Sequence, residues 1–596
     1  MALLQLGSPL IYCSFLSKTR PSCSQKHCAL SRFRCSATDR TASDQSSVVI
    51  RRSANYPPSP WDHNYLISLE NKYAKEERVR GRAKLLKEDV RKMLLETETS
   101  TEQLELIDAL QRLGISYHFE REIGDILTRI STVDRKGGKK EELHATALEF
   151  RLLRQHGFSI SEDVFDIFMN ETKAGEFKTS ISEDPKGLLS LYEASYLTTK
   201  SDTKLKEARS YATERLREII ERSSNTDHDE TQSYMSKMVI HVLEMPYHWR
   251  VKRLEAHWYI DVYGKRHDMN PVLLEFAKLD FNIVQYVHQE DLKNLSGWWN
   301  NSGLAKQLDF ARDRIAEHFF WGLALVDEPH SGYIRRMLAK IFAFMIPMDD
   351  IYDIYGTIEE LETFTAAIEQ WDVNRLEELP EYMRLCFLLL YNTVNEIGFD
   401  VVRDKRINVI PYLKDAWTGY CKCLLREAKW YKNGDNPSLD EYMQNTMVLA
   451  SIVLQQLYCA CYSDKNSDTI LDTASDNYRS VTESSMTVLR LANDLDEMER
   501  GDTLKSIQCY MNEKGATEEE AREHVRVMIS GAWDELNREM TATDQSTLPK
   551  GFIEVAMNLA RASLCVYQYG DGLGSPEKSK MVDRVLSLLV NHVPLD

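Results

Sequence analysis

The sequence is poor in proline and glycine, with 16 and 25 of them in 596 residues. It also lacks convincing runs of alternating polar and apolar residues and the turn signals that join β-hairpins. Long helices joined by short loops need few residues that break helices. These absences argue against a β-sheet protein and predict an all-α fold.

Acidic residues are almost missing from the first fifty positions, which hold only Asp39 and Asp44 against six Lys/Arg and ten Ser. This bias is typical of an organelle transit peptide, and the serine content favours the plastid stroma over the mitochondrion. A disordered basic tail is the alternative. The apolar stretch at positions 10–13 is too short for a membrane span, so we expect none. We assign residues 1–50 to the transit peptide.

Basic charge is also in deficit, since the net charge is -18. This charge argues against nucleic acid as a partner, and any anionic substrate must be met by a local basic patch or by a metal ion. Seven cysteines follow the leader, and the close pairs are Cys421/Cys423 and Cys459/Cys461. In each pair the two cysteines are two positions apart, so on a helix their thiols would be separated by about 200° around the helix axis. We expect reduced core cysteines rather than a metal clamp.

Helical periodicity begins near residue 60. Leu106, Ala109 and Leu110, for example, stand at i, i+3 and i+4 and build one apolar face. A turn signal at positions 268–271 precedes a further apolar run. The sequence therefore predicts two helical domains, at residues 51–268 and 269–596.

A cluster of acids follows an apolar run at positions 341–346. Asp349 and Asp353 are i and i+4 and would project from one face of a helix, with Asp350 about 100° away. Acids in such a setting are costly unless a cation neutralises them, and a hard divalent ion shared with a substrate diphosphate meets that need. A helix end that dips into solvent is the plainer interpretation.

A second polar cluster lies 140 residues after Asp353. Asn493 and Glu497 are again i and i+4, and Arg490 lies on the same side. Oxygen ligands on two opposed helices could hold several Mg²⁺ (or Mn²⁺) ions around one diphosphate, and Arg490 could bind its oxygens. Taken alone, Asn493 and Glu497 are also what a solvated helix face typically contains.

Two further elements flank these clusters. Arg312 opens an Arg-Asp-Arg triplet that is followed by Trp321, whose ring could be core or could stabilise a carbocation by cation–π attraction. A segment with Arg51, Arg52 and, nine residues after Arg52, Trp61 contains three prolines. We call residues 51–61 the strap, because the prolines favour an extended chain that lies across another domain.

Taken together and in this order, these motifs resemble those of plant terpene synthases of the monoterpene type, and the likeness covers nearly all of the chain after the leader. The resemblance implies an N-terminal α-barrel-like domain without catalytic residues and a C-terminal ionisation-type domain. No Asp-x-Asp-Asp motif for protonation-initiated cyclisation is present.

The resemblance also implies the activity and the site. The enzyme would ionise geranyl diphosphate with Mg²⁺ and release diphosphate and a cyclic or acyclic monoterpene, acting as a monomer or homodimer. The residues implied fall into three groups. Metal would be bound by Asp349, Asp350, Asp353, Asn493 and Glu497; diphosphate by Arg312 and Arg490; and the cation would lie near Trp321.

One departure leaves alternatives open. The family's second metal motif carries a hydroxyl at i+4 and a glutamate at i+8 from its first residue, where this chain has Glu497 and Gly501. Four residues are missing, and because four residues turn a helix by only about 40° net, Glu497 could replace the glutamate. A weakly active or non-catalytic prenyl-diphosphate-binding relative, or a sesquiterpene synthase using farnesyl diphosphate, are the competing hypotheses.

Overall fold

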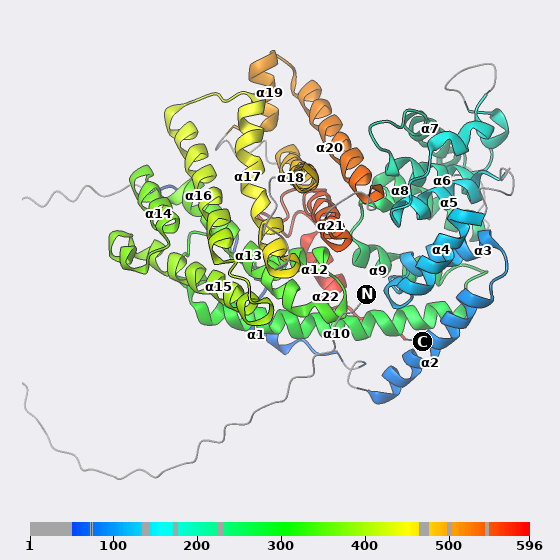
Figure 1. Cartoon of the computed structure of the whole chain (residues 1–596), viewed down its shortest axis with the longest axis horizontal. Coiled ribbons are helices and arrows are strands. Elements are labelled where there is room, and N and C mark those ends of the chain that lie inside the picture. Colours follow the sequence, from blue (N-terminus) through cyan, green and yellow to red (C-terminus); the bar gives the residue numbers. More distant parts are fainter. Residues whose placement is uncertain are drawn as a thin grey trace, which may run out of the picture. The chain divides into compact units, whose positions relative to one another are not determined.

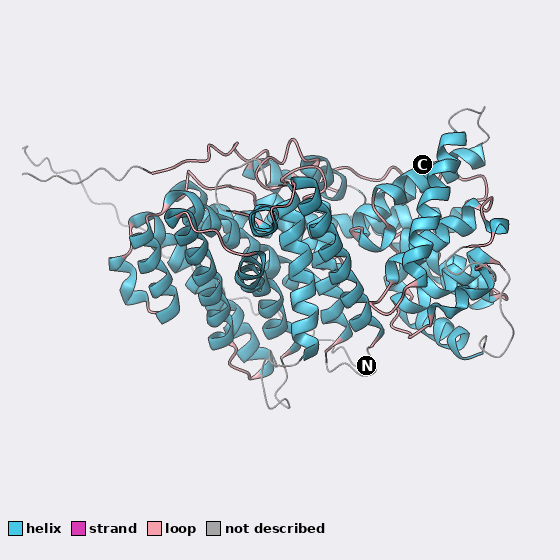
Figure 2. Cartoon of the chain, turned by 90° about the horizontal axis from the view of Figure 1, so that it is seen from above, coloured by secondary structure: helices cyan, strands magenta, loops and turns pink. Residues whose placement is uncertain are grey.

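The structure is a computed structural model that describes residues 51–71, 73, 76–133, 142–170, 177–223, 230–463, 476–496, 504–542 and 548–595. The predicted transit peptide lies outside the described residues, and residues Arg51–Asp596 form one compact unit. Throughout the described part the ordered elements are helices, and Figure 2 shows no strand among them. The prediction of an all-α fold is confirmed.

The first half of the described chain forms nine α-helices. They are α1 (His63–Ser68), α2 (Glu77–Glu96), α3 (Ser100–Arg112), α4 (Glu120–Val133), α5 (Leu143–Gln155), α6 (Pro185–Ala194), α7 (Lys204–Ser223), α8 (Glu230–Glu244) and α9 (Lys252–Tyr263). Short 3₁₀ turns connect several of them, such as η6 (Ser195–Leu197) and η7 (Tyr247–Trp249).

The second half begins with the longest described helix, α10 (Pro271–Ser302). The following helices are α11 (Leu304–Gln307), α12 (Ile315–Leu325), α13 (Gly332–Asp350), α14 (Ile358–Gln370), α15 (Glu381–Lys405), α16 (Ile410–Asn433), α17 (Leu439–Leu457), α18 (Asp476–Asp496), α19 (Ser506–Lys514), α20 (Glu518–Thr541), α21 (Lys550–Val566) and α22 (Met581–Leu589).

Local sequence explains where these helices begin. Asn270 accepts hydrogen bonds from the amides of Val272 and Leu273, and Pro271 occupies the first helical position of α10. A helix therefore starts at the predicted domain boundary, although the division of the chain there stays a prediction. Capping boxes start α14, α17 and α20, with Thr or Ser at the N-cap and Glu three residues later.

Helix α10 links the two halves. It packs against α1, α2 and α9 as well as against α12, α13 and α22 (Figure 1). One hydrophobic cluster runs through both halves, from Trp61 to Val593. Since burial of apolar surface is the main stabilising contribution, this shared core fixes the strap and the C-terminal helices in one frame.

One described helix, α15, is long and apolar enough by length and composition to cross a membrane. It packs against α13, α14 and α16, and 44% of its apolar window is buried inside the protein. Part of its hydrophobic surface thus serves the core of the helical unit, whereas Leu388 and Phe399 are exposed. The seven cysteines after the leader are free thiols, six of them buried, as the sequence predicted.

Candidate active site

The aspartate-rich segment lies at the end of α13, which continues directly into a π-helical turn, η9 (Ile351–Tyr355). The sequence prediction assumed regular α-helical spacing, whereas the structure places Asp349 in the α-helix and Asp353 in the π-turn. Backbone bonds in such a turn span five residues instead of four, and π-turns occur often at functional sites.

Arg312 ties this segment to the turn before α12. Its backbone amide donates to Asp350 Oδ2 at 2.8 Å, its Nε donates to Asp350 Oδ1 at 2.9 Å, and its Nη2 donates to Asp349 Oδ2 at 2.8 Å. Burial opposes the charge of Arg312, yet these carboxylates, Asp350 foremost, raise its pKa well above the usual value. Both oxygens of Asp350 are thus engaged by Arg312, whereas Asp349 is one-third exposed (35%).

Asp353 has a different environment. Its Oδ1 is buried and has no hydrogen-bond partner. Burial, followed by the negative charge of Asp349, raises the pKa of Asp353 well above its usual value, and Lys505 and Arg312 only partly oppose this. A buried carboxylate of this kind is stable only with a proton or a cation beside it.

A divalent cation fits these residues. Asp349, Asp353 and the buried Glu427 of α16 are electrostatically coupled, and all three offer carboxylate oxygens, the donor type that Mg²⁺ prefers. In the described part of the chain no three acidic, histidine or cysteine side chains converge on one point. The remaining ligands of an ion held here would include oxygens of water or substrate.

The second wall is provided by α18. Asn493 is buried there (9% exposed), and the neighbouring Asp494 accepts hydrogen bonds from the hydroxyl of Tyr442, from the amide of Ser506 and from Arg490 Nε at 2.7 Å. Asp494 therefore fixes Arg490, which the sequence assigned to the diphosphate. Glu497 lies outside the described residues.

Two charged residues of this region were not predicted from the sequence. Glu427 accepts a hydrogen bond from Asn445 at 3.0 Å, and burial raises its pKa although Arg490 and Lys505 lower it. Lys505, which precedes α19, interacts with Asp353 and Glu427 by charge. Neither carries a distinctive sequence signal, because an acid within a helix and a lysine just before a helix are common on solvated surfaces.

The aromatic side of the region lies on α12. Trp321 is buried (1% exposed), and its ring lies 5.0 Å from that of Phe342 and 6.3 Å from that of Tyr567 between ring centroids. Its indole Nε1 has no hydrogen-bond partner. The ring of Trp321 therefore offers an aromatic contact surface to this side of the region.

The strap passes directly over the aspartate-rich segment. Arg51 forms two hydrogen bonds to the carboxylate of Glu360, at 2.7 and 2.9 Å, and Arg52 donates to the backbone oxygen of Asp353. The ring of Tyr56 lies 4.9 Å from the guanidinium carbon of Arg312. The expectation that this segment lies across another part of the chain agrees with these contacts.

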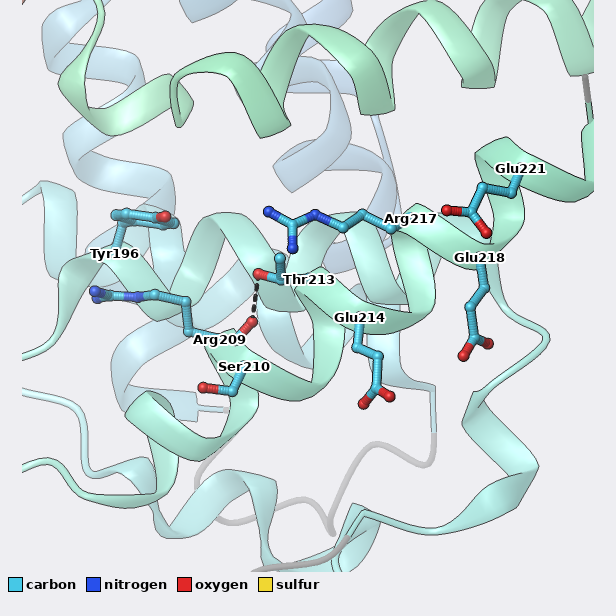
Figure 3. A pocket seen from close by; sticks show the side chains of 8 residues that line it. All are labelled: Tyr196, Arg209, Ser210, Thr213, Glu214, Arg217, Glu218 and Glu221. Atoms are coloured by element: carbon cyan, nitrogen blue, oxygen red, sulfur yellow. Dashed lines mark hydrogen bonds between the residues drawn. The ribbon is translucent and has the colours of Figure 1, made fainter. Parts of the chain in front are cut away.

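An open pocket of about 510 Å³ lies elsewhere, on α7 and η6 (Figure 3). It is lined by Tyr196, Arg209, Ser210, Thr213, Glu214, Arg217, Glu218 and Glu221. Arg209 is engaged there, because it donates to Ser195 O and lies over the ring of Tyr196. The pocket contains none of the residues that surround Asp353, so it is separate from the candidate site.

Comparison with known proteins identifies the architecture. Residues 60–243 match the family described as "Terpene synthase, N-terminal domain", and residues 300–535 match "Terpene synthase family, metal binding domain". The chain is 54% identical to an (E)-beta-ocimene synthase of Arabidopsis thaliana, over 96% of this chain and 98% of that one. The chain belongs to the terpene synthase family.

Other relatives extend the likeness of this terpene synthase. A tricyclene synthase of Arabidopsis thaliana is 53% identical over the whole of both chains. A limonene synthase structure with 2-fluorolinalyl diphosphate has a TM-score of 0.83 at 39% identity, covering 91% of this chain and 100% of that one. Isoprene synthase of grey poplar, solved with three Mg²⁺ ions and dimethylallyl-S-thiolodiphosphate, has a TM-score of 0.80 at 41% identity, covering 90% and 99%.

These findings confirm several predictions. The chain is an enzyme of the terpene synthase family with that family's metal-binding domain, and the isoprene synthase structure supports Mg²⁺ as its cofactor. Both Arabidopsis relatives are chloroplastic by name, which confirms the plastid as its compartment. The individual site residues and the oligomeric state stay predictions.

Proposed function

We propose that this enzyme is a monoterpene synthase that ionises geranyl diphosphate with the help of Mg²⁺ and releases diphosphate and a cyclic or acyclic monoterpene. The observation that carries the proposal is the buried, unpartnered oxygen of Asp353, a carboxyl group that interacts by charge with Asp349 and Glu427. Relatives named for monoterpenes, matched over almost the whole chain, support it.

Asp349 and Asp353 are the proposed ligands on one wall and Asn493 is the proposed ligand on the other, with Glu497 beyond the described residues. Asp350 acts chiefly by holding Arg312, since Arg312 engages both of its oxygens. Bound Mg²⁺ would neutralise the diphosphate oxygens and so make diphosphate a better leaving group.

Three cations of the chain would receive the departing anion. Arg312 is held by Asp349 and Asp350, Arg490 is held by Asp494, and Lys505 lies within the same electrostatic cluster. When the bond between C1 and oxygen breaks, the electron pair leaves with diphosphate. Guanidinium groups fixed in advance stabilise that charge without reorganising.

The allylic cation that remains needs apolar walls and the exclusion of water. We assign Trp321 to its stabilisation by cation–π attraction, and contacts of the strap with the aspartate-rich segment support the exclusion of water. Tyr569, in the segment after α21, is an unsuitable base because a neutral phenol oxygen is only weakly basic, and its hydroxyl proton is donated to Glu244. We therefore assign the final proton transfer to the released diphosphate.

The test is incubation of the protein, without residues 1–50, with geranyl or farnesyl diphosphate and Mg²⁺, followed by analysis of the volatile products. Monoterpenes from geranyl diphosphate are expected. Sesquiterpenes formed at much higher efficiency from farnesyl diphosphate would favour the competing substrate. An absence of product from both substrates would favour a non-catalytic relative. The shortened second metal motif is the reason for testing this alternative.

A further inference from the structure

Arg314 ends the Arg-Asp-Arg triplet, yet its environment differs from that of Arg312. Its side chain is fully buried (0% exposed) and donates to three backbone carbonyls. Nε donates to Leu573 O at 2.7 Å, Nη1 to Asp313 O at 2.8 Å and Nη2 to Pro57 O at 2.8 Å. The hydrogen bonds of Arg314 therefore bind backbone carbonyl groups, whereas those of the Arg312 side chain bind the carboxylates of the site.

Two of these carbonyls belong to segments from opposite ends of the chain. Pro57 lies in the middle of the strap, and Leu573 lies in the loop that joins α21 to α22. A single guanidinium group therefore bridges the two segments. Because the group is planar and rigid, a shift of either segment changes the geometry available to the other.

The strap has a second attachment in the first turn of α12, the helix that Arg314 directly precedes. Trp61 donates its indole N–H to Glu317 Oε1 at 2.9 Å, and Glu317 lies three residues after Arg314 on α12. At its other end, Arg52 of the strap donates to the backbone oxygen of Asp353. Between Arg52 and Pro57, the ring of Tyr56 lies against the guanidinium group of Arg312. The position of the strap over the site is therefore set from α12.

The C-terminal loop is tightly built and contributes to the aromatic wall. Asp571 accepts a hydrogen bond from the amide of Leu573 at 2.8 Å. A Cβ at Gly572 would lie 2.8 Å from the backbone oxygen of Val566, so no larger residue fits there without a shift. Tyr567, at the start of this loop, faces Trp321. Displacing the loop would open the wall beside the cation.

We propose that Arg314 is a positioning residue that fastens the strap and the C-terminal loop into one cover over the active site. This inference rests on the proposed function for its catalytic consequence, because the cover matters only where a carbocation must be kept from water. When the cover loosens, water adds to the cation through its oxygen lone pair. The proton then released from that oxygen passes to diphosphate, and the product is an alcohol instead of a hydrocarbon.

The experiment compares the full chain with Arg314→Lys, which keeps the charge and a donor but cannot reach both carbonyls. Amide hydrogen exchange without substrate is measured in residues 51–61 and 567–575. Exchange is expected to rise about fivefold in both segments, the factor that corresponds to one lost hydrogen bond. Arg336→Lys, at a partly buried arginine paired with Asp291, is the control for general loosening and should leave both segments unchanged.

The products from geranyl diphosphate are the second measurement. We expect the alcohol fraction to rise severalfold in Arg314→Lys, with kcat for hydrocarbons falling more than KM rises. Unchanged exchange, or a rise in one segment alone, would overturn the joint role, as would increased exchange in both segments with an unchanged alcohol fraction. A wild-type protein that makes no product would refute the proposed function, while the exchange result would still decide the coupling.

A second variant covers the case in which Arg314→Lys does not fold. Trp61→Phe removes only the indole N–H that binds Glu317 and loosens the strap from its other attachment. Coupling through Arg314 predicts increased exchange in residues 571–575 as well as in the strap. Exchange confined to the strap would contradict the proposal.

Discussion

At the scale of single residues, the three aspartates of one motif have three different environments. Asp349 is partly exposed and bound to Arg312, Asp350 is fully engaged by Arg312, and Asp353 has one buried oxygen without a hydrogen-bond partner. Their substitution should therefore affect stability and activity differently, although the sequence presents them as equivalents.

We expect Asp353→Asn to reduce turnover by orders of magnitude while leaving the thermal midpoint unchanged or higher. The change removes a metal ligand and also a buried charge that the fold does not compensate.

Asp350→Asn should instead lower stability by about 3 kcal/mol, because it leaves Arg312 buried without its main partner. Kinetics at saturating Mg²⁺ and thermal unfolding measure the two effects. Near-normal turnover of Asp353→Asn would refute the metal assignment.

Glu427 provides a second prediction at this scale. If its carboxylate belongs to the metal site, Glu427→Gln should raise the Mg²⁺ concentration needed for half-maximal rate by about tenfold, since Asn445 can still bind the remaining amide oxygen. The matched control is Glu396→Gln, at an exposed acid of α15 paired with Lys340. An equal Mg²⁺ requirement in wild type and both variants would exclude Glu427 from the site.

At the scale of elements, the sequence predicted the walls but not their detail. The acidic spacing and the extended, proline-containing strap were recognisable because both depart from ordinary amphipathic helices. The π-turn at η9 was not, because its wider bonding arises from tertiary packing and has no periodicity of its own. Glu427 was missed because nothing in α16 distinguishes it from a solvated acid until the helix is packed against α17 and its partner Asn445.

The strap itself can be tested at this scale. Arg52 is exposed and contacts the backbone of Asp353 and the ring of Tyr431, so Arg52→Ala should leave the fold intact. We expect kcat/KM for geranyl diphosphate to fall about tenfold, and the value for linalyl diphosphate to fall less. Arg80→Ala, at an exposed position of α2, is the control. Equal losses with both substrates would contradict a role of the strap in cyclisation.

The shortened motif begins at Asn493 in α18 and leads to a prediction outside the described residues. If Glu497 replaces the missing glutamate, Glu497→Gln should sharply weaken Mg²⁺-dependent turnover, whereas Glu499→Gln should have little effect. On a continued helix Glu499 would point about 200° away from Glu497. Equal losses in the two variants would show that this segment does not ligate metal in the proposed way.

At the scale of the whole molecule, the two halves meet through polar contacts as well as the shared core. His248, on η7 of the first half, forms a 2.8 Å hydrogen bond between its Nε2 and Oδ1 of Asn537 on α20. Asn537 also donates to the backbone oxygens of Tyr196 and Thr198. The relative placement of the halves therefore depends on an imidazole that is buried within their contact.

The protonation of His248 makes this contact sensitive to acid. Burial, and then the charge of Arg561, lower the pKa of His248 to about 3, whereas an unfolded histidine titrates near 6.5. Below about pH 6.5 the unfolded chain binds a proton that the folded chain does not accept. The contribution of this group to stability is therefore complete above pH 6.5 and is lost as the pH falls towards 3.

We expect the wild type to lose about 2 kcal/mol of unfolding free energy through His248 between pH 7 and pH 5, and His248→Gln to lose that much less over the same range. Glutamine does not titrate, and its amide can still donate to Asn537. Urea unfolding of both proteins at the two pH values measures the difference. Glu317 and Glu328, whose pKa values burial raises to about 7, act in the opposite direction but equally in both proteins, so they cancel. An identical pH dependence in the two proteins would show that the halves are not joined through a neutral His248.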